Sequence, residues 1–228
     1  MRKFFLTAAA VFLTGIFCTA GFSATVDVIQ LEDDTINPVT AEYILNAITR
    51  AEASGAQCLI IRLDTPGGLL NSTRTIVKAI MAAQVPVVVY IAPGGSRAGS
   101  AGVFMTYAAH VAAMAPSTNI GAAHPVQMGQ RDERTNMWDA LKELVKAKKT
   151  ENGETEEENP AADEGETADA RPMESKILND TVAFIKSIAE QRGRNVDWAV
   201  QSVVKSESIT EQDALVKGVI EIIAVDNA

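Results

Sequence analysis

Residues 87–109 read VVVYIAPGGSRAGSAGVFMTYAA, and the character of the chain changes twice within them. The first part is apolar and rich in β-branched residues, which predicts a buried strand. Small residues follow, and from Val103 onward the apolar residues have helical spacing. This order places Ser100 at a helix N-terminus, where unpaired N–H groups carry partial positive charge. Ser100 is therefore a candidate nucleophile, while a helix N-cap or a small packing residue is the alternative interpretation.

The sequence on both sides continues this alternation of strands and helices. Apolar runs predict strands at 26–31, 57–63 and 111–114, in addition to 87–91. Helical spacing is found at 40–53 and 69–83 and again after Ser100. Such an order predicts an α/β fold, with a parallel sheet whose strands are joined by right-handed crossover helices.

A second glycine turn, Asp64-Thr65-Pro66-Gly67-Gly68, follows the predicted strand at 57–63. Both turns lie at carboxyl ends of predicted parallel strands, where open α/β sheets place their sites. Glycines can present bare N–H groups to an oxyanion. We therefore expect Gly67, Gly68 and Ala101 to form an oxyanion hole beside Ser100.

Several motifs occur in a consistent order: LDTPGG from Leu63, GSAG around Ser100, GAAHPV from Gly121, and ESKILND and GVIEIIA near the C-terminus. Together they resemble the N-terminal protease domain of the NfeD family, whose members are membrane-associated serine proteases. The resemblance implies a ClpP/crotonase-like fold. It also implies a Ser–Lys dyad, in which Ser100 matches the nucleophile and Lys176 matches the general base.

Lys176 can act as a general base only when its amine is neutral, because a protonated amine cannot accept a proton. A lysine in water is protonated at neutral pH, so a catalytic lysine must be desolvated. Lys176 begins an apolar helical pattern that could supply such a site. His124 is the competing candidate: it is an alternative base, a contact in the substrate cleft, or a structural residue. We interpret His110, at the end of an alanine-rich helix, as a C-terminal cap.

The N-terminus and the composition limit where the protein acts. Residues 1–24 combine a basic start, a short apolar run and small residues, which is typical of a signal peptide; an uncleaved anchor is the alternative. We therefore expect an exported protein, periplasmic or extracytoplasmic, with membrane association implied by the family. With two histidines and no cysteine motif, we expect no metal and no cofactor. No basic stripe favours nucleic acid.

The negative charge is concentrated in one segment. The formal net charge is −9, and residues 151–169 contain nine acidic residues without lysine or arginine. Residues 127–172 contain few large apolar side chains, which predicts a mobile acidic insertion. It separates Ser100 from Lys176 in sequence, so it is a candidate lid. The protease core is accordingly expected in two parts, 25–126 and 173–228.

Taken together, these features indicate an exported serine endopeptidase with a Ser100–Lys176 dyad. The resemblance implies hydrophobic peptide substrates, including segments of stomatin-like membrane proteins, and a homodimer or larger homo-oligomer. Two alternatives remain on the same fold: a catalytically idle binding module for membrane partners, and a crotonase-like acyl-CoA enzyme.

Overall fold

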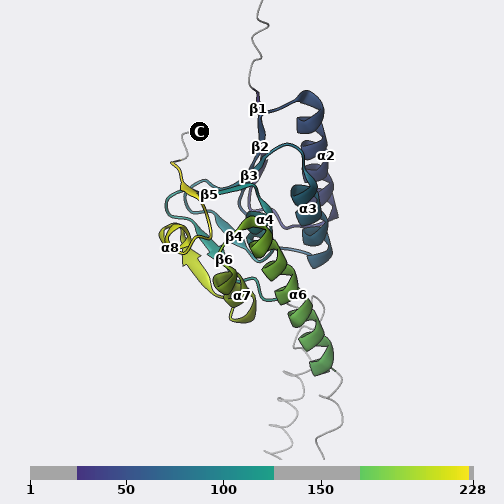
Figure 1. The fold of residues 1–228 in the computed structure, drawn as a ribbon, viewed down its shortest axis with the longest axis vertical. Helices are drawn as coiled ribbons and strands as arrows, with labels where there is room; N and C mark the ends of the chain where they lie inside the picture. Colours follow the sequence, from purple (N-terminus) through teal and green to yellow (C-terminus); the bar gives the residue numbers. More distant parts are fainter. Residues whose placement is uncertain (1–24, 126–169, 226–228) are drawn as a thin grey trace, which may run out of the picture.

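The computed structural model describes residues 25–125 and 170–225, in which strands and helices alternate (Figure 1). The elements are β1 (Val26–Leu31), α2 (Pro38–Ser54), β2 (Cys58–Leu63), α3 (Leu70–Ala82), β3 (Val87–Ile91), β4 (Arg97–Gly99), α4 (Ala101–Ala108), β5 (Val111–Met114), β6 (Asn119–Gly121), α6 (Ala170–Arg192), α7 (Val196–Val204), β7 (Ser208–Thr210), α8 (Glu211–Val216) and β8 (Ile222–Ile223). The α/β fold expected from the sequence is confirmed.

The larger sheet has five parallel strands in the order β1-β2-β3-β5-β8. Alternate residues of β2 and β3 are fully buried, as expected where one face of a sheet packs on helices. Helices α2 and α3 lie side by side along the first strands (Figure 1). The core therefore lies between this sheet and the helices that connect its strands.

A smaller sheet has the order β4-β6-β7. A bridge between Thr65 and Ala98 joins its strand β4 to the turn that follows β2. Strands β4 and β6 are parallel, and β6 and β7 are antiparallel. The sequence placed the Ser100 turn directly after the strand at 87–91. This detail was wrong, because β4 intervenes and Ser100 follows β4 instead.

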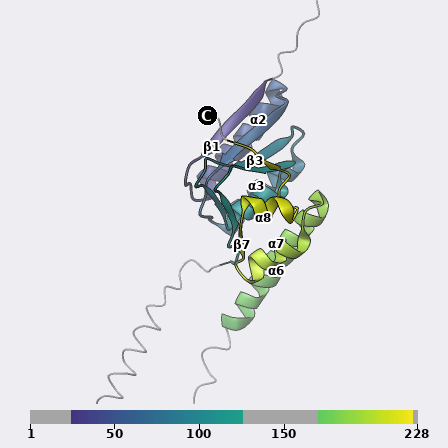
Figure 2. The ribbon, with the colours of Figure 1, turned by 90° about the vertical axis from the view of Figure 1, so that its left-hand side faces the viewer.

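The C-terminal helices α6 and α7 pack on the side of the molecule where α4 lies. Helix α6 packs against both α4 and α7. Figure 1 shows α4 beside α6, and Figures 1 and 2 show α7 beside α6. Two aromatic pairs define this contact: Phe104 stacks on Phe184 with ring centroids 5.5 Å apart, and Tyr107 on Trp198 at 6.1 Å. Such pairs add to the apolar area that the rings bury. The aromatic contacts thus tie α4 to α6 and α7.

The predicted signal at 1–24 and most of the predicted insertion at 127–172 lie outside the described residues. Helix α6 begins at Ala170, so the last residues of the predicted insertion, 170–172, belong to its first turn. Within 25–125 and 170–225, no helix is long and apolar enough to cross a membrane.

Helix α2 has clear start and stop signals in the sequence. The side chain of Asn37 accepts hydrogen bonds from the N–H groups of Val39 and Thr40, at 2.8 and 3.1 Å. Pro38 occupies the first turn, and Gly55 ends the helix with a φ of 70°. Local sequence therefore determines the bounds of this helix.

We predict that Asn37→Ala lowers the free energy of unfolding by about 1 kcal/mol, because two N–H groups lose their acceptor. Urea denaturation measures the change. The matched control is Asn46→Ala, an exposed position inside the same helix, where alanine should be neutral or slightly stabilising. Equal losses in the two variants would contradict the capping role.

Candidate active site

Ser100 joins β4 to α4 in a backbone conformation that non-glycine residues rarely adopt. Its φ is 45° and its ψ is −102°. Such a conformation costs on the order of 1–3 kcal/mol and often marks a functional position. The half-buried side chain makes no capping hydrogen bond. Ser100 thus occupies the N-cap position of α4, as the alternative interpretation expected, but its hydroxyl caps no N–H group of the helix.

The Gly67-Gly68 turn lies directly against this serine. A Cβ atom placed on Gly67 would lie 2.7 Å from the Cβ of Ser100 and 3.3 Å from its Oγ. Gly67 also has a φ of 125°, a conformation that favours glycine. The structure therefore brings together the two glycine turns that the sequence singled out, and Gly67 allows their close approach.

Not all of the expected oxyanion donors are available. The Gly67 N–H donates to Thr65 Oγ1 at 3.1 Å, so this donor is already engaged within its own turn. Around Gly68, Ile36 N–H donates to Gly67 O, and Leu69 N–H donates to Ile36 O. These two hydrogen bonds form a parallel β-bridge between Ile36 and Gly68. In such a bridge the N–H of Gly68 points away from Ile36, and no described residue accepts a hydrogen bond from it. Gly68 therefore keeps an unused donor.

The second unused donor belongs to the first turn of α4. The N–H of Ala101 has no acceptor among the described residues, as expected at a helix N-terminus. Ala101 follows Ser100 directly and is buried. Gly68 and Ala101 thus present free N–H groups on the two turns that meet at Ser100.

Lys176 lies on α6, at the same end of the α4–α6 pair as Ser100. The two helices run in the same direction, because Phe104 contacts Phe184 and, further along, Ala108 O accepts from Arg192 Nε at 2.8 Å. Ser100 precedes Phe104 by about 6 Å of helix and Lys176 precedes Phe184 by about 12 Å. Lys176 therefore lies in the N-terminal turns of α6, beyond the level of Ser100. Figure 1 shows that α6 projects from the body of the molecule at its N-terminal end.

The environment of Lys176 differs from the dry site expected from the sequence. Its side chain is exposed. Among the described contacts, no hydrogen bond or ion pair joins it to Ser100 or to another residue. The structure places the lysine on the expected helix, at the expected end, but not in contact with the serine.

His124 follows β6 and is exposed. Its Nδ1 lies 2.9 Å from Val203 O. A carbonyl only accepts, so this contact assigns the hydrogen to Nδ1 and leaves the lone pair on Nε2. No hydrogen bond between His124 and Ser100 is present in the described structure. The observed contact ties the segment after β6 to the end of α7.

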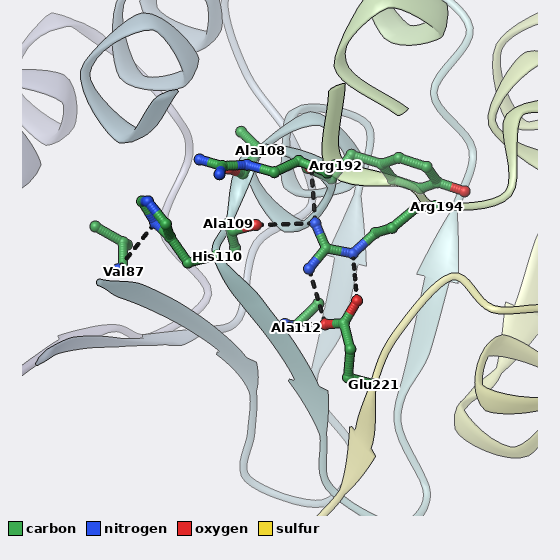
Figure 3. Close-up of polar contacts among 9 residues, drawn as sticks. Val87, Ala108, Ala109, His110, Ala112, Arg192, Arg194 and Glu221 are labelled. Atoms are coloured by element: carbon green, nitrogen blue, oxygen red, sulfur yellow. Dashed lines mark hydrogen bonds and ion pairs between the residues drawn. The ribbon is translucent and has the colours of Figure 1, made fainter. Parts of the chain in front are cut away.

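Two arginines hold the C-terminal end of α4: Arg192, the last residue of α6, and Arg194 in the turn that follows (Figure 3). Arg194 is buried and donates to the carbonyls of Tyr107 and Ala109, both at 2.9 Å. Its Nε and Nη2 donate to the Glu221 carboxylate, both at 2.8 Å. Cations at a helix C-terminus are favourable because the carbonyls there are unpaired. The helix that carries Ser100 is thus fixed at its far end.

Burial also keeps Tyr107 neutral in this region. Desolvation raises the pKa of Tyr107 well above its ordinary value, against a smaller opposing effect of Arg194. The neutral hydroxyl donates to Asn195 O at 2.9 Å. This hydrogen bond adds to the anchoring of α4 against the start of α7.

His110 does not cap α4, contrary to the expectation from sequence. The C-cap is Ala109, and the Val87 N–H donates to His110 Nδ1 at 3.1 Å (Figure 3). Burial lowers the pKa of His110, and the charges of Arg192 and Arg194 lower it further. The ring is therefore a neutral acceptor that joins the end of α4 to β3.

We predict that His110 makes stability depend on pH. Its folded pKa is below the ordinary 6.5, so its contribution is present above that value and is lost as pH falls towards the folded pKa. His110→Asn should reduce this loss by about 0.5 kcal/mol or less, because solvent screens a partly exposed ring. Urea unfolding at pH 7.5 and 5.5 measures it. His124→Asn is the control and should retain the loss.

Sequence reasoning missed the side chains that fix these turns. Thr65 is fully buried, and its Oγ1 donates to Asp34 O at 2.5 Å while accepting from Gly67. Asp64 Oδ1 accepts from the Arg97 N–H at 3.0 Å, which holds the start of β4. The position of a threonine and an aspartate before two glycines was the available signal. Within residues 25–125 and 170–225, no group of three or more metal-ligating side chains occurs.

Comparison with protein families matches residues 25–179 to the N-terminal domain of NfeD1b. Among curated proteins, the membrane-bound protease PH1510 of Pyrococcus horikoshii is 35% identical over 191 residues, covering 84% of this chain and 35% of that protein. Membrane protein NfeD1b of Bacillus subtilis is 31% identical over 99 residues, covering 43% and 22%. The chain thus spans about a third of the first relative and less of the second.

Solved structures of the 1510-N protease domain are similar to this fold. A serine-to-alanine variant, described as a membrane-bound stomatin-specific protease, has a TM-score of 0.68 and 32% identity, covering 89% of this chain and 81% of that one. A lysine-to-alanine variant in complex with a substrate peptide has a TM-score of 0.66 and 33% identity, covering 89% and 76%.

Proposed function

This chain belongs to the family of NfeD1b N-terminal domains, and on that premise we propose that it is a serine endopeptidase with Ser100 as nucleophile. The observation that carries the proposal is the strained backbone of Ser100, whose hydroxyl no helix cap uses. Strain of this kind persists only where surrounding structure enforces it. Here it presents an unused hydroxyl beside two unused N–H groups.

The proposed reaction begins when Ser100 Oγ attacks the scissile carbonyl carbon of a bound peptide. The hydroxyl proton passes to the base, and the carbonyl oxygen becomes an oxyanion. Hydrogen bonds from Gly68 and Ala101 stabilise that charge, an effect worth about 3 kcal/mol for each donor in known cases. The base then protonates the leaving amine, and water hydrolyses the acyl-enzyme.

We assign the base to Lys176. Three observations support the assignment: its place on α6, the parallel packing of α4 and α6, and solved relatives in which a serine or a lysine is replaced. In the exposed position that Lys176 occupies here, solvent favours its charged form. The proposal therefore requires that the N-terminal turns of α6 approach Ser100 when a peptide is bound.

The substrate class follows from the relatives. One of them is described as stomatin-specific, so we propose hydrophobic peptide segments, including those of stomatin-like membrane proteins, as substrates. Export through residues 1–24, membrane association and assembly as a homodimer or larger oligomer remain part of the same proposal. His124 remains the alternative base, since Nε2 is the nitrogen left with a lone pair.

We predict that a fluorophosphonate probe labels Ser100 and that Ser100→Ala abolishes both labelling and cleavage of an apolar peptide. The fold should survive, because the hydroxyl makes no hydrogen bond with a described residue. Ser187→Ala, an exposed serine on α6, is the control and should label normally. A wild-type protein that resists the probe and cleaves no apolar peptide would favour the idle binding module. Thioester turnover would favour the acyl-CoA enzyme.

We predict that Lys176→Ala lowers kcat by roughly 10²- to 10⁴-fold, because the serine loses its base. Lys186→Ala on the same helix, where Lys186 pairs with Glu190 at 3.8 Å, should retain wild-type turnover. His124→Ala should have a much smaller effect than Lys176→Ala. An inactive His124→Ala enzyme beside an active Lys176→Ala enzyme would assign the base to His124.

A further inference from the structure

The Arg74 side chain lies where three helices meet. It extends from α3, and its Nη2 donates to Asp180 Oδ2 on α6 at 2.5 Å. Its guanidinium also lies over the Phe184 ring, 4.3 Å from the centroid. Phe184 in turn stacks on Phe104 of α4. A single cation therefore contacts α6 directly and α4 through one ring.

Each of these helices is adjacent to one part of the candidate site. Helix α3 begins two residues after Gly68. Phe104 lies one turn after Ser100, and Asp180 lies one turn after Lys176. The contacts of Arg74 thus connect the elements that carry the oxyanion turn, the nucleophile and the base.

Asp180 poses an electrostatic problem for a lysine base. Residues four apart on a helix lie on the same face, so the carboxylate is within reach of the Lys176 ammonium. A nearby carboxylate stabilises the charged amine and opposes its loss of a proton. In the structure, however, the Asp180 carboxylate is engaged by Arg74.

We propose that Arg74 is a positioning residue for the base: it holds the Asp180 carboxylate and prevents it from pairing with the Lys176 ammonium. Two effects act in the same direction. The guanidinium neutralises the carboxylate, and its own positive charge disfavours a second cation nearby. The inference rests on the proposed role of Lys176 as base.

The other charges near this helix do not share this arrangement. Helix α4 contains no charged residue, and Lys78 lies one turn beyond Arg74 on α3. Beyond Asp180, ten or more residues of α6, about 15 Å of helix or more, separate Lys176 from the next charges on that helix, which are Lys186, Glu190 and Arg192. That distance exceeds the screening length at physiological salt. Asp197 lies at the start of α7, which follows the far end of α6. Arg171 and Glu174, which precede Lys176 in sequence, and Lys205 and Glu207, which follow α7, stay unchanged in every variant below.

The test compares the protonation of Lys176 in four full-length proteins: wild type, Arg74→Gln, Asp180→Asn and the double variant. Acetic anhydride acetylates neutral amines, and mass spectrometry gives the rate at Lys176 as a function of pH. We expect the midpoint of the acetylation rate to rise by roughly 0.2–0.4 pH unit in Arg74→Gln, the size of an exposed i,i+4 ion pair, and to fall in Asp180→Asn. In the double variant the midpoint should return towards the wild-type value. Lys186 provides an internal control with an unchanged midpoint.

Either of two results would overturn the inference. One is an unchanged Lys176 midpoint in Arg74→Gln; the other is an equal rise in the single and the double variant. Arg74→Lys retains a cation that can pair with Asp180 and should keep the wild-type midpoint. If Arg74→Gln does not fold, Asp180→Asn decides the matter, since an unchanged midpoint there would also contradict the proposal.

Turnover separates this inference from the proposed function. If Lys176 is the base, kcat should rise with pH as the lysine loses its proton, and the midpoint of that rise should shift together with the acetylation midpoint in each variant. A general loss of stability would instead lower kcat at all pH values without shifting the midpoint of that rise. If the acetylation midpoint shifts and the pH dependence of kcat does not, Arg74 affects the protonation of Lys176 but has no role in catalysis. An unshifted midpoint beside an inactive Lys176→Ala enzyme would reject the inference and retain the dyad.

Discussion

The backbone at Ser100 depends on hydrogen bonds that reach it from two different segments. Gly99 N–H donates to Thr65 O at 2.9 Å, and Ser100 N–H donates to Gly121 O at 3.0 Å. Between these fixed points, the residue has little freedom to leave its positive φ. The same two bonds place the start of α4 between the turn after β2 and the end of β6. The geometry of the candidate site is thus primarily a property of the main chain.

Helix α4 is short, yet it is held at both ends. At the N-terminus its orientation follows from the constrained serine. At the C-terminus, Arg192 and Arg194 donate to three successive carbonyls, and Glu221 balances the buried charge of Arg194. A buried arginine is tolerated only when its donors are satisfied in this way. The hydroxyl and the N–H of Ala101 therefore belong to a rigid element, which suits donors that must be oriented before charge develops.

The sequence predicted those features that depend on local pattern. Strands β1, β3 and β5 have the predicted bounds: β3 and β5 are apolar runs, and apolar residues predominate in β1. Strands β4, β7 and β8 were missed, since two or three residues are too few to show a period. The use of the Gly67 N–H by Thr65 and the partner of His110 were also missed. Both depend on where a side chain meets a distant backbone group, which one-dimensional patterns do not encode.

The contacts of α6 become weaker along the helix in the direction of Lys176. Ile185, Ile188 and Ala189 are buried, whereas the residues around Lys176 are half-buried or exposed. Local stability follows such contacts, so the N-terminal turns can move at lower cost than the rest of the helix. In the proposed dyad, the nucleophile and the oxyanion donors are fixed in advance, and the base is the adjustable member. A lysine needs this more than a histidine would, because it must leave solvent to become neutral.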